Sequence, residues 1–297
     1  MFAAIAPLLA QIPLSAERIH DAPAWLNWSS NSVLVGIVVL VLILVWTRRA
    51  TKEIRLVPAK PGGQNLAEGV IEMLYGTLEG IVGGHMIARV FPLLATFFLF
   101  ILTANWFALL PGVGTIGFGE HRGSFLSLPH LEAPLLRATN ADLNMTLAMA
   151  LLFMVAWLFW TISELGVVGF IKHTFGVKGG LKGILKFLLA PLFFFVGVIE
   201  IISIVFRPVS LSLRLFGNVY AGENLLHTMS DLGHMMHAPD WLAFVMSFVI
   251  PIPFYFLEIL VGILQALVFT LLCAVYIQLS TTHEEGHGEA EHEAAAH

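Results

Sequence analysis

The stretch FLLAPLFFFVGVIEIISIVFRPVSLSLRLFGNVYAGENLLH, residues 187–227, decides the fold. As an α-helix it would be about 60 Å long, twice the roughly 30 Å of a bilayer core. Its middle has no polar break, so it is either a hairpin with an apolar turn or one long helix lying very obliquely. Pro191 lies near its N-terminal end, which favours the single oblique helix, and Pro208 is predicted to kink it.

A second stretch of similar length, residues 241–282, has the same character. Pro251 and Pro253 lie toward its N-terminal end and again favour one tilted helix over a hairpin. The two long stretches therefore predict the last two of a set of membrane-crossing helices.

The composition excludes soluble proteins. Of 297 residues, 58% are hydrophobic and only 12% charged, where a soluble chain has about 25% charged residues. Five of the 20 acidic residues fall in the last fourteen positions, so the rest of the chain is charge-balanced and nothing indicates nucleic-acid binding. Cys273 is the only cysteine, which excludes an intramolecular disulfide and a thiolate metal cluster, and no cofactor is expected.

The fold class predicted is an all-α integral membrane protein with five membrane-crossing helices, the last two long and strongly tilted. A further helix has apolar and acidic residues on opposite sides, a pattern typical of an amphipathic helix in the membrane interface. Residues 1–282 are predicted to form a single membrane domain, followed by a cytoplasmic tail at 283–297. The predicted spans are about 31–48, 90–111, 142–170, 187–227 and 241–282, with the interfacial helix at about 64–86.

Lysines and arginines predict the orientation, because they accumulate in short cytoplasmic loops. With an odd number of crossings, the N-terminus is expected outside and the C-terminus in the cytoplasm. The apolar residues 1–14 lack a basic start and are interpreted as a packed or interfacial segment rather than a signal peptide. The basic residues expected inside are Arg48, Arg49, Lys52, Arg55, Lys60, Arg89, Lys172, Lys178, Lys182 and Lys186, and those expected outside are Arg18, Arg122 and Arg137.

Few ionisable residues fall within the spans, and each is a candidate functional group because charge at membrane depth is costly. Glu164 is interpreted as a helix-end carboxylate and Arg207 as a snorkelling residue or a partner of Glu200. Arg214 has no acid nearby in sequence, which makes it the strongest functional candidate. The other candidates are Glu223, Glu258, Gln265 and Asp142.

Helical spacing groups these residues. Glu200, Arg207 and Arg214 are seven residues apart and line one face, close to Ser203, Ser210 and Asn218. Glu258 and Gln265 are also seven apart. If Gln265 is level with Arg214, Glu258 reaches the depth of Glu223, and the two carboxylates can share one outer vestibule.

At these residues the sequence resembles subunit a of the F-type ATP synthase. The strings that carry the resemblance are RPVSLSLRLFGNVYAGE at 207–223, LQALVF at 264–269 and NADLNMTLAMAL at 140–151. Glu200, fourteen residues before Arg214, also matches, and the order of spans agrees from residue 27 to about 282.

The resemblance implies a non-catalytic stator beside a rotating c-ring whose subunits each carry a carboxylate, in a cell inner membrane. Further implied partners are the peripheral-stalk b subunits, the rest of the complex and membrane lipid. Arg214 would keep the passing ring carboxylate ionised and block leakage, with Gln265 bonding nearby. The implied outer half-channel contains Glu223, Glu258, Asp142 and Asn144, and the inner one Glu200 and Ser203.

One departure from the family concerns Glu223 and Glu258, where many members have one histidine and one glutamate. Two close carboxylates resist joint ionisation and can relay a proton, and His227 can supply an imidazole. The same oxygens could bind sodium. We favour the proton as the transported ion. The sequence of the c-ring subunit would decide between proton and sodium.

Two other segments contain ionisable residues that need no functional role to explain them. Residues 112–141 form an external insert, interpreted as a surface loop. The tail is interpreted as solvated and disordered rather than metal-binding, despite His283, His287, His292 and His297.

Two alternative function classes remain. A self-contained secondary transporter would show paired internal repeats, and none is found. A membrane metalloenzyme needs closely spaced histidines at membrane depth. No glycine-rich phosphate loop with lysine occurs, so nucleotide chemistry is assigned to other subunits.

Overall fold

A computed structural model describes residues 30–52, 63–110, 113, 117–118, 133–134, 137–175, 184–237 and 239–281. Helices form nearly all of this part of the chain, and the exception is a two-residue antiparallel pairing of β1 with β2. The elements are α2 Asn31–Ala50, α3 Gly63–Val82, α4 Gly84–Ala108, β1 Gly117–Phe118, β2 Ala133–Pro134, η1 Thr139–Ala141, α5 Leu143–Phe175, α6 Ile184–Met235, α7 Asp240–Val249 and α8 Ile252–Thr281.

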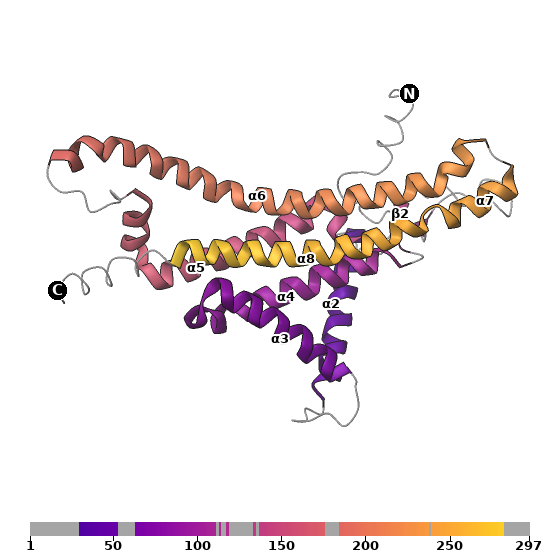
Figure 1. The fold of residues 1–297 in the computed structure, drawn as a ribbon, viewed down its shortest axis with the longest axis horizontal. Helices are drawn as coiled ribbons and strands as arrows, with labels where there is room; N and C mark the ends of the chain where they lie inside the picture. Colours follow the sequence, from indigo (N-terminus) through magenta and orange to yellow (C-terminus); the bar gives the residue numbers. More distant parts are fainter. Residues whose placement is uncertain are drawn as a thin grey trace, which may run out of the picture.

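The prediction of an all-α membrane protein is confirmed. Five helices in the described part of the chain are long and apolar enough to cross a bilayer. α6 is a single helix of 52 residues that continues through Pro191 and Pro208, so the hairpin alternative is wrong for this stretch. In Figure 1, α6 bends gently and lies beside the antiparallel α8, whereas α2 runs crosswise to both.

The boundary between the predicted interfacial helix and the second span differs from the sequence expectation. The structure divides them at Gly83, which has φ 87°, a conformation that favours glycine. The charge-free run alone had suggested a start at residue 90, but Arg89 lies inside α4 and pairs with Glu164 of α5.

The second long stretch is interrupted rather than continuous. α7 ends at Val249 and α8 begins at Ile252, on either side of a turn that contains Pro251. Proline lacks a backbone N–H and clashes with the preceding helical turn, which accounts for the break. A second irregularity is Gly166 in α5, where φ is 69°.

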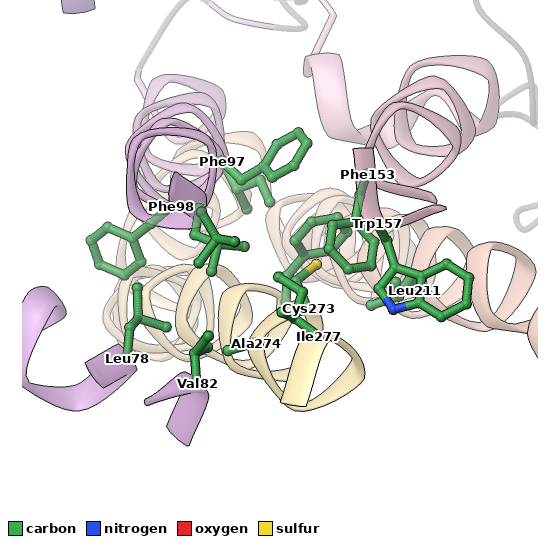
Figure 2. Close-up of a cluster of buried hydrophobic side chains, with 14 of the residues drawn as sticks. Leu78, Val82, Phe97, Phe98, Phe153, Trp157, Leu211, Cys273, Ala274 and Ile277 are labelled. Carbon is green, nitrogen blue, oxygen red and sulfur yellow. The ribbon is translucent and has the colours of Figure 1, made fainter. Parts of the chain in front are cut away.

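The core lies where α3, α4, α5, α6 and α8 meet. Figure 2 shows Phe153 and Trp157 of α5 beside Cys273 and Ile277 of α8, with Leu211 of α6 next to them. α3 contributes one buried stripe at helical spacing, and its opposite side is exposed. That stripe consists of Leu74, Leu78 and Val82.

α6 is covered on one side only. In its most apolar window 11% of the residues are buried within the chain, against 39% in α4 and in the segment formed by α7 and α8. The uncovered apolar side chains include Phe195, Ile199, Ile202, Val205 and Phe206. An apolar surface of this extent requires lipid or a protein partner.

Several sequence predictions fall outside the described residues. These are the segment 1–14, most of the 112–141 insert, the tail 283–297 and much of the two basic loops.

The contact between α6 and the end of α5 yields a test of the fold. A Cβ at Gly197 would lie 2.6 Å from the Phe175 ring and 2.7 Å from the Thr174 carbonyl oxygen. Gly197→Leu should therefore lower the free energy of unfolding by about 1–3 kcal/mol, the usual cost of overpacking. Denaturant titration of the purified protein in detergent measures it.

Gly80 provides the matched control, because a Cβ there meets nothing within 4 Å. Gly80→Ala should stabilise the protein by about 0.5–1 kcal/mol through helix propensity. Equal effects of the two substitutions would contradict the α5–α6 contact.

Candidate functional site

Arg214 lies on the uncovered side of α6. Its side chain is exposed, and among the described residues it has no hydrogen-bond or ion-pair partner. The neighbouring Leu211 and Leu215 are buried against the other helices, which fixes the rotation of α6 and turns Arg214 outward. Ser203, about three turns earlier on α6, is exposed as well.

Gln265 joins α8 to α6 close to this arginine. Its side-chain oxygen accepts a hydrogen bond of 2.5 Å from Asn218 Nδ2, and only 4% of the residue is exposed. The structure pairs Gln265 with Asn218, about one helical turn beyond Arg214 along α6. Gln265 Nε2 is buried without a hydrogen-bond partner in the described part of the chain.

Glu258 approaches α6 at a glycine. A Cβ at Gly222 would collide with the Glu258 carboxylate, so the absence of a side chain there permits the contact. Gly222 directly precedes Glu223, which brings the two glutamates to a similar level of the α6–α8 pair.

Glu223 is followed one helical turn later on α6 by His227. Its Oε2 atom is buried and has no hydrogen-bond partner among the residues described. His227 is itself exposed and lies 3.4 Å from Asp231, measured from Nδ1 to Oδ2.

Asp142 anchors a buried polar group at the start of α5. One carboxylate oxygen accepts a 2.6 Å hydrogen bond from Ser32 Oγ of α2, and the other accepts a 3.0 Å bond from the Asn144 backbone N–H. The second bond caps α5. The side chain of Asn144 is exposed, so this residue takes part through its backbone.

An amide pair extends this buried polar group toward α8. Asn140 Nδ2 donates a 2.7 Å hydrogen bond to Asn105 Oδ1 of α4. Asn105 Nδ2 in turn donates to the Gly262 carbonyl oxygen of α8 at 3.4 Å. Polar groups therefore connect α2, α4, η1 and α8 at one end of the bundle.

Glu200 and Arg207 lie at a separate pocket. Arg207 is stacked between two aromatic rings, 5.3 Å from the Trp157 centroid and 4.8 Å from the Tyr276 centroid. Trp157 Nε1 also donates a 2.9 Å hydrogen bond to the Tyr276 carbonyl oxygen, which ties α5 to α8. Glu200 and Arg207 are both in the pocket lining, together with Thr161, Ser280, Leu165, Phe170, Ile204 and Leu279.

Sequence reasoning missed four residues of the outer region. Arg137 was counted only as a basic residue of an external loop, yet 3% of it is exposed. Ser32, Asn105 and Asn140 are buried too. Ser32 and Asn105 could have been found in the sequence as polar residues at the ends of apolar runs. Their contacts with η1 are visible only in the tertiary structure.

The described residues contain no group of three histidine, cysteine or carboxylate side chains arranged to hold a metal ion. The arrangement instead offers two polar regions on α6, one on either side of Arg214. Carboxyl, amide and hydroxyl groups of this kind can bind and pass protons or small cations.

Comparisons with known proteins show which family the chain resembles. A family model described as ATP synthase A chain matches residues 30–278. The chain is 33% identical over 259 residues to ATP synthase subunit a of Protochlamydia amoebophila, covering 86% of this chain and 82% of that protein. It is 31% identical to the Moorella thermoacetica protein of the same name over 81% of this chain and 85% of that one. It is 30% identical to ATP synthase subunit a of Mycobacterium tuberculosis, over 94% of this chain and 98% of that protein.

Removing the hydroxyl that bonds Asp142 tests the buried polar group. Ser32 is fully buried, so Ser32→Ala leaves a carboxylate oxygen without its donor. The free energy of unfolding should fall by about 1–3 kcal/mol. Denaturant titration in detergent measures the change.

Ser247→Ala is the control, because the Ser247 hydroxyl bonds only the Phe244 carbonyl of its own helix at an exposed position. It should change stability by less than about 0.5 kcal/mol. A Ser32→Ala protein as stable as this control would contradict the hydrogen bond to Asp142.

Proposed function

The chain belongs to the ATP synthase subunit a family, and from that premise we propose that it is the non-catalytic stator subunit that guides ions past the c-ring of an F-type ATP synthase. Ion flow through two half-channels, each open to one side of the membrane, would be coupled to ring rotation. The nucleotide chemistry would belong to other subunits.

The exposed side chain of Arg214 carries this proposal. A guanidinium stays charged at any physiological pH, and an uncompensated charge at membrane depth is costly. Arg214 has no acidic partner within the described residues, and the helix side around it is apolar and uncovered. A carboxylate presented by another subunit, as on a c-ring, would compensate the charge.

The outer half-channel would contain Glu223, Glu258 and Asp142. One observation supports the grouping of the two glutamates: the contact of Glu258 with Gly222, beside Glu223. Asn144 and His227 would lie at its margin, since both side chains are exposed.

The inner half-channel would start at the pocket that contains Glu200. Ser203, exposed one turn further along α6, would lead from there toward Arg214. Asn218 and Gln265 would separate this inner route from the outer one, because their hydrogen bond closes the α6–α8 contact about one turn beyond Arg214.

The uncovered side of α6 would face the c-ring, and the remaining apolar surfaces would contact lipid and the peripheral-stalk b subunits. The location would be the cell inner membrane. With basic loops in the cytoplasm, the N-terminus would lie outside and the C-terminus inside.

The favoured ion is the proton, with sodium as the alternative. A self-contained transporter is less consistent with membership of a family of ATP synthase subunits.

Arg214→Ala should abolish coupled ATP synthesis while the complex still assembles, because it removes the charge that attracts the ring carboxylate and blocks leakage. Arg214→Lys should also fail or nearly fail, since an ammonium is more strongly hydrated and lacks the planar fork. Ion-driven ATP synthesis in membrane vesicles measures both variants, with the amount of assembled complex as the reference. Wild-type synthesis by Arg214→Ala would contradict the proposed function.

Glu258→His tests the ion. If protons pass, synthesis should survive in this variant, because imidazole titrates near neutral pH, and should fall in Glu258→Ala. If sodium passes, the histidine should impair transport, because imidazolium repels the cation and imidazole is a poorer ligand for it.

Synthesis is measured for both variants with and without sodium and across pH. A sodium requirement of the unmodified complex that the histidine weakens would establish sodium as the coupling ion. Sodium-independent synthesis that survives in the histidine variant alone would support the proton.

A further inference from the structure

Arg207 and Arg214 occupy nearly the same side of α6 but differ in what surrounds them. They are seven residues apart, so their side chains project about 20° apart around the helix and about 10 Å apart along it. Arg207 is half-buried, whereas Arg214 is exposed. The geometry of the helix alone would therefore let both guanidinium groups face the same partner.

Two aromatic side chains account for the difference. The Arg207 guanidinium carbon lies 5.3 Å from the Trp157 ring centroid and 4.8 Å from the Tyr276 ring centroid. Both distances are within the roughly 6 Å at which a cation is attracted to an aromatic face, and the attraction is stronger where water is excluded. Among the described residues, Arg214 has no such contact.

The two aromatic side chains are held by contacts that do not involve Arg207. Trp157 is 2% exposed, and its Nε1 donates a 2.9 Å hydrogen bond to the Tyr276 carbonyl oxygen. One turn further along both helices, Thr161 Oγ1 donates a 3.2 Å hydrogen bond to Ser280 Oγ. These two consecutive bonds join α5 to α8, so the site that receives Arg207 is built by the other two helices.

A second free guanidinium would interfere with the task proposed for Arg214. Any cation on the uncovered side of α6 attracts a carboxylate of the c-ring, and one that lies two turns from Arg214 would hold it at the wrong level of the membrane. The chain compensates Arg207 internally, through the two aromatic faces and through Glu200, which lines the same pocket.

We propose that Trp157 and Tyr276 are positioning residues for ion transfer, which hold Arg207 away from the c-ring so that the c-ring carboxylate meets Arg214 alone. This inference rests on the proposed function. The two aromatic residues act through Arg207 and do not themselves touch the transported ion. Arg207 is then a cation that the chain must keep out of the contact with the c-ring.

Removing one aromatic face tests the inference in the assembled complex. Tyr276→Leu keeps the backbone carbonyl that bonds Trp157 but loses the aromatic ring, which should shift the balance between held and freed Arg207 by about tenfold. ATP synthesis per assembled complex, measured in membrane vesicles, should therefore fall by at least about threefold. Tyr276→Phe is the matched control and should retain most of the synthesis, because it keeps the aromatic face.

Arg207→Gln distinguishes this positioning role from simple packing. If Tyr276 only fills space, Tyr276→Leu should lower synthesis by the same factor with or without Arg207→Gln in the same chain. If it holds the guanidinium, Arg207→Gln alone should retain most of the synthesis, and adding Tyr276→Leu to it should cause no further loss.

Passive proton leakage separates the expected effect from damage to the membrane barrier. Arg214 is intact in all of these variants, so vesicles that contain Tyr276→Leu should be as tight to protons as those with the unmodified complex.

Four results would overturn the inference: unreduced synthesis in Tyr276→Leu, an equal loss from this substitution in both backgrounds, inactivity of Arg207→Gln alone, or passive leakage in Tyr276→Leu. If Tyr276→Leu fails to assemble, assembly restored by Arg207→Gln would support the inference, and assembly still absent would overturn it. Failure of the proposed function is recognised separately, by synthesis that survives in Arg214→Ala.

Discussion

A charged guanidinium on the uncovered side of a membrane helix is the constraint on which the other features depend. Arg214 cannot lose its charge, and no acid within the described chain compensates it. The opposite side of α6 must therefore be held firmly so that this side stays turned outward. Leu211 and Leu215, buried against α5 and α8, do so by packing.

The long helices can approach each other because small and amide residues occupy their contacts. Without a hydrophobic driving force between helices in lipid, close packing and interhelical hydrogen bonds supply the attraction. Gly222 permits the approach of Glu258, and the Asn218–Gln265 hydrogen bond joins the same two helices nearer to Arg214. The contacts that stabilise the helix pair are thus the contacts that position its ionisable groups.

The two ends of the bundle compensate charge by different means. At the end that contains η1, carboxyl, hydroxyl and amide groups satisfy one another through short, buried hydrogen bonds such as Ser32–Asp142 and Asn140–Asn105. At the opposite end, the faces of Trp157 and Tyr276 contact the charge of Arg207. Cation–π contacts of this kind leave the edge of the guanidinium available to other polar groups.

The sequence by itself determined the fold class and the five apolar segments, favoured a single helix at 187–227 and made the intramembrane charges the candidate functional residues. These follow from composition and from the 3.6-residue period, both of which are local properties. Only the tertiary structure decided which polar groups meet. Gln265 pairs with Asn218 of α6, and Ser32 bonds Asp142 although 110 positions separate them. Such pairings depend on how far one helix slides along another and on how a loop folds back, and neither quantity is encoded in the periodicity of a single segment.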